Sequence, residues 1–286
     1  MAETINNIQW FPGHMAKTRR LIKESLPLVD AVTELRDARI PLSSTNPELN
    51  DLIGNKPKII LLNKADLADS STTARWVDFY KKQGIPALAV DCKSGRGLNG
   101  YRDAVNALLA DKIRSNAEKG MAGKPLRIMV AGIPNTGKSS FINRMAKKGA
   151  AKVEDRAGVT RHNKWYVIGQ GLELLDTPGV LWPKFEDPEV GYRLAFTGGI
   201  KDQILDIETL AVRLLEILAQ DYPDRLIERY RLTDFEGLQG YALLEAVGRK
   251  RGMLVSGGEV DTERAAVMLF DELRGGKLGR ISFEKP

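Results

Sequence analysis

Residues 132–139 combine two glycines, a lysine and a serine at a spacing that suits phosphate chemistry. They fit the pattern G-x-x-x-x-G-K-[ST] and lie between an apolar run at 126–131 and a helical pattern at 140–145. In this context the glycines let backbone N–H groups surround a phosphate, the lysine neutralises its oxygens, and the serine hydroxyl reaches a magnesium ion. The pattern predicts nucleotide contacts from Asn135, Thr136, Gly137, Lys138, Ser139 and Ser140.

Residues 63–66, Asn-Lys-Ala-Asp, follow another apolar run and fit the pattern N-K-x-D. The Asp66 carboxylate can accept hydrogen bonds from N1–H and the exocyclic amine of guanine, and adenine offers neither donor. Lys64 is expected along the base, and Asn63 is expected to tie this loop to the phosphate loop. Alone, the pattern is also typical of a solvated turn, but together with the phosphate loop it predicts a guanine nucleotide.

Asp91, Cys92 and Lys93 follow the next predicted strand, where a second base-contacting loop is expected. They only approximate the usual S-A-K sequence, yet backbone N–H groups can reach the guanine carbonyl whatever the side chains are. A role for Cys92 as a small, buried apolar residue is compatible with the same loop.

Residues 176–179, Asp-Thr-Pro-Gly, fit the switch pattern D-x-x-G. Asp176 is expected to hold a magnesium-bound water, and the N–H of Gly179 is expected at the γ-phosphate. Thr160 lies between the phosphate loop and this motif, which makes it the natural second hydroxyl ligand. The predicted magnesium set is therefore Ser139, Thr160 and Asp176.

The order of these motifs is rotated relative to a conventional GTPase, in which the phosphate loop comes first and N-K-x-D comes last. A doubly wound sheet tolerates such a rotation because the order of strands in space need not follow the chain. The predicted fold is an α/β P-loop GTPase with a circularly permuted, doubly wound sheet. In this order the switch motif leads directly into the carboxyl-terminal part of the chain, so a γ-phosphate contact at Gly179 is expected to reposition that part.

Strand and helix patterns alternate in the first part of the chain and become helical in the second. Strands are expected at 58–63, 87–91, 126–131, 164–168 and 172–175, the last two as a hairpin. A helix is expected at 98–109, and residues 114–125 are expected to be a connection within the same domain. Further helices are expected at 204–218, 243–247 and 263–273. The predicted domains are a GTPase domain at 1–182 and a mostly α-helical, RNA- or ribosome-binding domain at 183–286.

Composition excludes several classes of protein. The 286 residues contain one cysteine, Cys92, and two histidines, which rules out an intrachain disulfide and a His- or Cys-rich metal site. No apolar stretch approaches the roughly 20 residues of a membrane helix, and the first residues do not resemble a secretory signal. The net charge of +6 permits an acidic partner such as nucleic acid without requiring one. A cytoplasmic location without a membrane partner is therefore expected.

The chain resembles the circularly permuted GTPases of the ribosome biogenesis GTPase A type. The resemblance rests on the motifs above together with Trp10–Met15, Asp37–Pro41, Asp176–Pro183 and Thr197–Lys201, and it covers nearly the whole chain. It implies a GTP-hydrolysing factor that binds the large ribosomal subunit late in assembly and leaves on hydrolysis. It also implies magnesium, a monomeric state and stimulation by the subunit.

Activation of the attacking water is the least defined step. Many GTPases use a glutamine directly after D-x-x-G, but here that residue is Val180, whose side chain forms no hydrogen bond. The resemblance points to His14, whose imidazole can accept a hydrogen bond from water, with a surface or capping role as the alternative and His162 as its rival. Asn135 resembles the asparagine of potassium-stimulated GTPases, and a simple loop hydrogen bond is the alternative.

Basic residues form three groups: Lys17, Arg19, Arg20 and Lys23; Arg249, Lys250 and Arg251; and Lys277 and Arg280. Each group alone is typical of a solvated face, but the ribosomal resemblance favours contacts with rRNA phosphates. Two other functions stay open at this stage. They are a GTP-gated scaffold that does not hydrolyse GTP, and an ATP-dependent P-loop kinase or transferase, which Asp66 opposes.

Overall fold

The computed structural model describes residues 12–148, 152–155, 164–169, 171–179, 181–182, 185–200, 206–233, 235 and 237–286. The chain forms two compact units. The helical unit includes Phe185–Ile281, and the sheet unit combines Gln9–Lys184 with Ser282–Pro286. This division differs from the expected 1–182 and 183–286 at the carboxyl terminus, because the last five residues bond to the sheet unit.

The sheet unit is built on a seven-stranded sheet with the order β3-β2-β1-β4-β7-β6-β5. The strands are β1 (Ala31–Asp37), β2 (Lys58–Asn63), β3 (Ala87–Ala89), β4 (Leu126–Ala131), β5 (Lys152–Asp155), β6 (Lys164–Val167) and β7 (Leu172–Asp176). Strands β3, β2, β1, β4 and β7 are parallel, whereas β6 is antiparallel to both β5 and β7. The order runs outward in both directions from the β1–β4 pair, which is the switch point where such sheets bind ligands.

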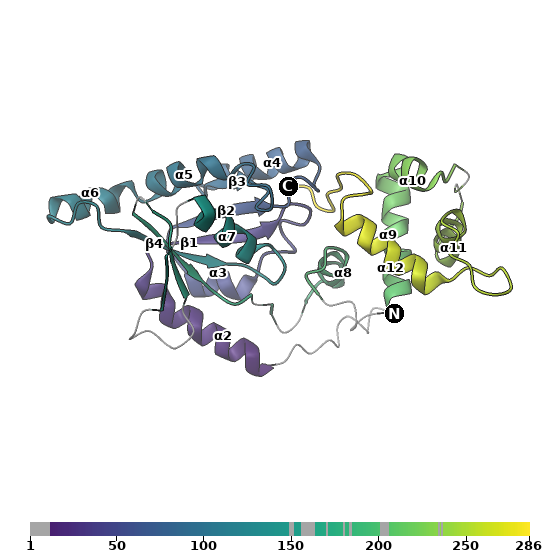
Figure 1. The fold of residues 1–286 in the computed structure, drawn as a ribbon, viewed down its shortest axis with the longest axis horizontal. Coiled ribbons are helices and arrows are strands. Elements are labelled where there is room, and N and C mark those ends of the chain that lie inside the picture. Colours follow the sequence, from purple (N-terminus) through teal and green to yellow (C-terminus); the bar gives the residue numbers. More distant parts are fainter. Residues whose placement is uncertain are drawn as a thin grey trace. The chain divides into compact units, whose positions relative to one another are not determined.

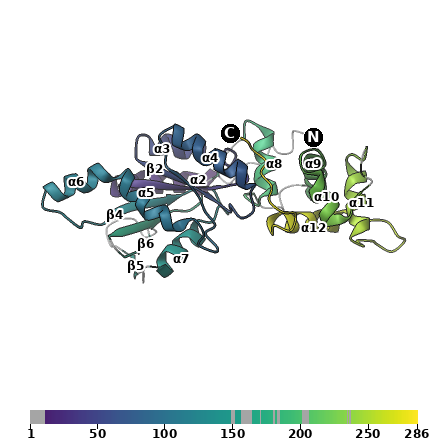
Figure 2. The ribbon, with the colours of Figure 1, turned by 90° about the horizontal axis from the view of Figure 1, so that it is seen from above.

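Helices cover both faces of the sheet (Figures 1 and 2). The sheet unit contains α2 (Pro12–Ser25), α3 (Pro47–Ile53), α4 (Ser70–Lys82), α5 (Tyr101–Leu108), α6 (Ala110–Glu118) and α7 (Lys138–Lys148). On one face, Tyr101 and Val105 of α5 and Phe141 of α7 join a core with alternate residues of β1, β2 and β4. On the other face, α2, α3 and α4 cover the remaining alternate residues. This burial explains why the parallel strands are almost continuously apolar.

The helical unit is organised around its longest helix. It contains α8 (Pro188–Phe196), α9 (Ile207–Asp221), α10 (Pro223–Tyr230), α11 (Tyr241–Lys250) and α12 (Thr262–Arg274), and α9 contacts the other four. Buried Leu210, Leu214 and Leu218 recur along one stripe of α9 at helical spacing. Asp206 caps the first turn by accepting hydrogen bonds from the N–H groups of Glu208 and Thr209.

The predicted fold class is confirmed, with local differences. The expected 98–109 helix consists of a 3-10 turn at Leu98–Gly100 followed by α5, and α6 begins directly after it and continues into the expected connection at 114–125. The β3 strand ends at Ala89 instead of 91. The hairpin of β6 and β7 is present with Tyr166 opposite Leu174. Strand β1, at the centre of the sheet, was not predicted.

Candidate functional site

The phosphate loop connects β4 to α7 at the carboxyl end of the sheet. Gly137 has φ 98°, and a Cβ atom there would lie 2.2 Å from Nδ2 of Asn63, so only glycine fits. Thr136 closes the loop by donating its hydroxyl to the carbonyl of Ile133 at 2.9 Å. Ser139 and Ser140 are exposed in the first turn of α7, where the helix amino terminus favours anions. This arrangement has the concave, glycine-lined geometry of an anion site.

Lys138 is held inside this loop. Its Nζ donates to the carbonyls of Gly132 at 3.0 Å and Ile133 at 2.9 Å, and the side chain is buried. Burial lowers the pKa of Lys138 to about 8, although the carboxylate of Asp176 acts in the opposite direction. Burial likewise raises the pKa of Asp176 against the effect of Lys138. Both groups are therefore poorly solvated charges that a phosphate and a cation would stabilise.

The D-x-x-G segment lies directly on the phosphate loop. A Cβ atom at Gly179 would lie 2.9 Å from Nζ of Lys138 and 2.9 Å from Cα of Pro134, so this position admits no side chain. Thr177 fixes the preceding turn by donating its hydroxyl to the carbonyl of Val130 at 2.6 Å. The structure thus brings Gly179 to the residue that is expected to contact the terminal phosphate.

Asn63 joins three loops through its side-chain amide and its backbone. Its Nδ2 donates to the carbonyl of Thr136 at 2.6 Å, and its Oδ1 accepts from the N–H of Cys92 at 2.9 Å. The backbone carbonyl of the same residue accepts from the N–H of Ala38 at 2.8 Å. The expected tie between the N-K-x-D loop and the phosphate loop is thus present as a buried hydrogen bond.

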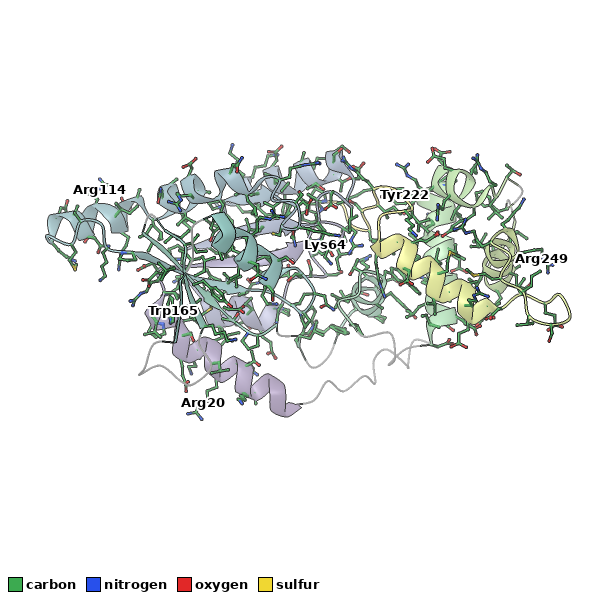
Figure 3. All side chains as sticks on the ribbon, viewed as in Figure 1. Arg20, Lys64, Arg114, Trp165, Tyr222 and Arg249 are labelled. Carbon is green, nitrogen blue, oxygen red and sulfur yellow. The ribbon has the colours of Figure 1, made fainter. Side chains whose placement is uncertain are left out.

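Lys64 (labelled in Figure 3) has φ 60°, which is unusual for a residue with a side chain. Its Nζ lies 2.9 Å from Oδ2 of Asp37, the last residue of β1. Asp37 is also bound by Arg39, whose Nη2 donates to Oδ2 at 2.7 Å and whose Nε donates to Oδ1 at 2.9 Å. Burial alone would raise the pKa of Asp37, but Arg39 and Lys64 hold it well below its usual range. Asp66, two residues beyond Lys64, is exposed.

Asp37 and Arg39 were not predicted to act at the site. The available signal was the run of charged residues that directly follows the apolar start of β1, because a charge at the carboxyl end of a parallel strand faces the ligand edge.

The second base loop is held by hydrogen bonds within the loop and by a hydrogen bond to Asn63. The Asp91 carboxylate accepts from the N–H groups of Lys93 at 2.9 Å and Ser94 at 3.2 Å. Burial acts to raise the pKa of Asp91, but these hydrogen bonds keep it below its ordinary value. Cys92 lies in the core, and burial raises the pKa of its thiol to about 12. Because the N–H of Cys92 is donated to Asn63, contact with a guanine carbonyl requires that bond to be shared or exchanged.

Several predicted residues fall outside the described part of the chain. Thr160, His162 and Val180 are not described, and for His14, which lies in α2, only the backbone is. Asn135 is exposed in the phosphate loop with φ 61°.

The predicted magnesium ligands Ser139 and Asp176 lie among the described residues, and their role as ligands stays a prediction. Ser139 is exposed in the first turn of α7, and the carboxylate of Asp176 interacts electrostatically with the ammonium of Lys138. Within the described ranges, no group of three or more His, Cys, Asp or Glu side chains could hold a metal.

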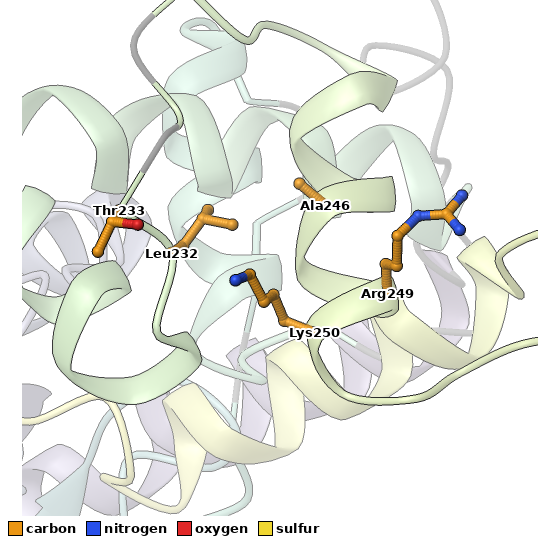
Figure 4. Close-up of a pocket in the computed structure, with 5 residues that line it drawn as sticks. All are labelled: Leu232, Thr233, Ala246, Arg249 and Lys250. Carbon is orange, nitrogen blue, oxygen red and sulfur yellow. The ribbon is translucent and has the colours of Figure 1, made fainter.

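The helical unit carries a basic pocket of about 410 Å³, lined by Leu232, Thr233, Ala246, Arg249 and Lys250. Figure 4 shows Lys250 extending toward Leu232, whereas the guanidinium of Arg249 points away from it. Several other cations of this unit are paired; for example, Arg251 lies 2.9 Å from Glu272 and Arg213 lies 3.0 Å from Glu189. Arg249 and Lys250 form no ion pair with any described residue.

In the basic group at 17–23, two arginines form ion pairs with nearby glutamates. Nε of Arg20 lies 2.7 Å from Glu24, and Nε of Arg19 lies 3.5 Å from Glu48. Lys277 and Arg280 are exposed. Among the parts of the chain that the structure describes, no helix is long and apolar enough to cross a membrane.

Comparison with known proteins agrees with this site. A family model described as 50S ribosome-binding GTPase matches residues 127–250. Ribosome biogenesis GTPase A of Bacillus licheniformis is 50% identical over 279 residues, which cover 98% of this chain and 98% of that protein. The crystal structure of GNP-bound YlqF from T. maritima has a TM-score of 0.66 at 30% identity and covers 94% of this chain and 98% of its own. The GDP-bound structure of the same protein has a TM-score of 0.64 at 31% identity and covers 93% of this chain and 98% of its own.

The base-selecting and switch motifs contact one phosphate loop and occur in a permuted order along the chain. The relatives named above align with this chain over nearly its full length. The chain is a GTP-hydrolysing enzyme, and it belongs to the ribosome biogenesis GTPase A family.

Proposed function

We propose that this GTPase binds the large ribosomal subunit late in its assembly and is released when GTP is hydrolysed. The observation that carries the proposal is the packing of Gly179 against Lys138 and Pro134. A γ-phosphate at Lys138 would bond to the N–H of Gly179, and hydrolysis would remove that bond. The chain continues from Gly179 into the helical unit, so the presence of the phosphate can alter how that unit is held.

In this proposal the three base and phosphate segments bind GTP. Asp66 pairs with N1–H and the amine of guanine, Lys64 lies along the base, and Asp91, Cys92 and Lys93 close the base site. Asn135, Thr136, Gly137, Lys138, Ser139 and Ser140 surround the phosphates. Ser139, Thr160 and Asp176 would hold magnesium, which neutralises charge on the β- and γ-phosphate oxygens.

The basic pocket is proposed to hold an rRNA phosphate. Lys250 provides an unpaired cation, Thr233 provides a hydroxyl, and Leu232 and Ala246 provide an apolar wall for the attached ribose. The family model's description as a 50S ribosome-binding GTPase supports the large subunit as the source of that RNA. We also propose that the protein acts as a monomer in the cytoplasm.

His14 is proposed to orient the attacking water once the enzyme is on the subunit, with His162 as the competing residue. Replacing potassium by sodium in a hydrolysis assay tests Asn135 separately. A potassium site there predicts slower turnover in sodium, and a loop hydrogen bond predicts no change.

Sedimentation with purified large subunits tests the proposal as a whole. Binding is expected with a non-hydrolysable GTP analogue, and release is expected with GDP. Lys250→Ala should weaken sedimentation, whereas Lys82→Gln, which removes an exposed charge on α4, should not. Equal sedimentation in GTP analogue and GDP would contradict release on hydrolysis.

A further inference from the structure

The tail formed by Ser282–Pro286 leaves the helical unit and bonds to the sheet unit next to α4 (Figure 1). Ser282 and Glu284 are buried there. The N–H of Phe283 donates to the carbonyl of Arg39 at 2.9 Å, and Nε1 of Trp76 in α4 donates to the carbonyl of Glu284 at 3.2 Å. The N–H of Asp69 donates to the hydroxyl of Ser282 at 3.1 Å. This tail is therefore a fixed part of the sheet unit.

The carboxylate of Glu284 organises the loop that follows β1. It accepts the N–H of Leu42 at 2.6 Å and the N–H of Ser43 at 3.0 Å, and it also accepts the Ser43 hydroxyl. Backbone N–H groups that converge on one carboxylate hold a loop strongly, because hydrogen bonds to a charged acceptor are stronger than those to a neutral one.

Further contacts connect this loop to Lys64. Ser44, beside Ser43, accepts the N–H of Asp37 with its hydroxyl at 3.0 Å and donates that hydroxyl to the carbonyl of Ile40 at 2.6 Å. The carboxylate of Asp37 then bonds to Nζ of Lys64 at 2.9 Å. Hydrogen bonds, the peptide link between Ser43 and Ser44, and the ion pair of Asp37 with Lys64 thus connect the tail to the N-K-x-D loop.

We infer that Glu284 is a positioning residue for guanine recognition, acting through the Leu42–Ser44 turn and Asp37 on Lys64. The inference rests on the proposed role of Asn63–Asp66 in reading the base. Lys64 has the left-handed backbone conformation, and its ammonium is held by the buried carboxylate of Asp37. Because GDP and GTP carry the same base, the tail should affect the affinities for both nucleotides equally.

A double-mutant cycle separates this positioning role from general stabilisation of the fold. The probe is fluorescent mant-GDP, titrated into the full-length chain. Glu284→Gln should weaken binding by about fivefold, the scale of one coupled hydrogen-bond network. In a Lys64→Met background, which lacks the ammonium, the same Glu284→Gln change should weaken binding by less than about twofold because the path is already broken.

Lys285→Gln is the matched control, since Lys285 is the exposed neighbour of Glu284. It should leave mant-GDP affinity unchanged. If Glu284→Gln does not fold, Ser43→Ala replaces it in the same cycle, because it removes only the hydroxyl that Glu284 accepts. Equal weakening in the wild-type and Lys64→Met backgrounds, or no weakening in the wild-type background, overturns the inference.

Asp66→Asn distinguishes failure of this inference from failure of the base-site proposal. If Asp66→Asn does not shift preference from guanine toward xanthine nucleotides, the base-site proposal is wrong. If Asp66→Asn does shift it and the cycle shows no coupling, only the tail inference is wrong.

Discussion

The Lys138 ammonium lies in an environment that favours binding of an anion. Its ammonium bonds to two backbone carbonyls, and burial makes the charge costly, so that the pKa falls to about 8. A polyphosphate would supply the missing counter-charge and raise that pKa again. Nucleotide binding should therefore take up a proton at mildly alkaline pH.

The pH dependence of affinity checks this expectation. Since only the protonated lysine binds phosphate well, the dissociation constant for GDP should rise by about fourfold between pH 7 and pH 8.5. Calorimetry at pH 8.5 in two buffers of different ionisation enthalpy should show proton uptake. A flat affinity profile would mean that Lys138 is already fully charged in the free protein.

Asp66 is exposed and provides the clearest test of base selection. In Asp66→Asn, an amide replaces the carboxylate, so residue 66 presents an N–H donor in place of an acceptor; the exocyclic carbonyl of xanthine can accept that hydrogen bond, whereas the exocyclic amine of guanine cannot. Preference should move from GTP to xanthosine triphosphate by a factor that corresponds to a few kcal/mol, about the cost of a buried unpaired polar group. Competition between the two nucleotides measures it, and retention of wild-type GTP preference would exclude Asp66 as the base reader.

His14 is tested by separating affinity from stimulated turnover. His14→Ala should keep its affinity for GTP, while turnover in the presence of large subunits should fall by about 100-fold or more, the scale of lost general-base help. If release follows hydrolysis, as proposed above, the variant should sediment with subunits in GTP. Normal stimulated turnover would exclude His14 as the residue that orients the water and would favour His162 or a ribosomal group in that role.

At the scale of elements, the sequence predicted what apolar periodicity and glycine spacing encode. The strands that lead to the three motifs and the long stripe of α9 follow from such patterns. Strand β1 did not, because Glu34, Arg36 and Asp37 give it the appearance of a polar surface segment. In the structure Glu34 and Arg36 form a buried pair at 2.8 Å, and Arg36 donates to the hydroxyl of Tyr80 at 2.9 Å. Only tertiary contacts make those charges compatible with a central strand.

The site residues that belong to local sequence motifs were predictable, and those positioned by long-range contacts were not. Lys138, Asn63 and Gly179 belong to local motifs with fixed spacing, and the structure brings them together. Asp37 contacts Lys64 and Glu284 contacts Ser43 across long sequence separations, so no local pattern reveals either contact.

Leu214, buried in α9, tests whether the helical unit is energetically separate. Leu214→Ala should lower the free energy of unfolding of that unit by roughly 2–5 kcal/mol, as expected for a cavity in a helical core. GDP affinity should stay the same, because the nucleotide loops belong to the sheet unit. Denaturant unfolding followed by circular dichroism, alongside a mant-GDP titration, would show both; lost nucleotide affinity would mean that the units share one core.

At the scale of the whole molecule, a net charge of +6 favours association with a polyanion. The affinity for large subunits should fall as salt rises, because phosphate contacts release counterions. Lys250→Ala should reduce the slope of log affinity against log salt by about 0.7–0.9, the contribution of one phosphate contact. An unchanged slope with reduced affinity would indicate a packing role for Lys250.

The tail also has a consequence for folding kinetics. The contact between Ser43 and Glu284 spans 241 residues, with the whole helical unit between the switch motif and the tail. Closing so long a loop in an unstructured chain is entropically unfavourable, but a helical unit that has already folded holds its two ends at a fixed separation and shortens the effective loop. The nucleotide site should therefore mature in two stages during refolding, with loose base binding first and full affinity only after the tail has docked.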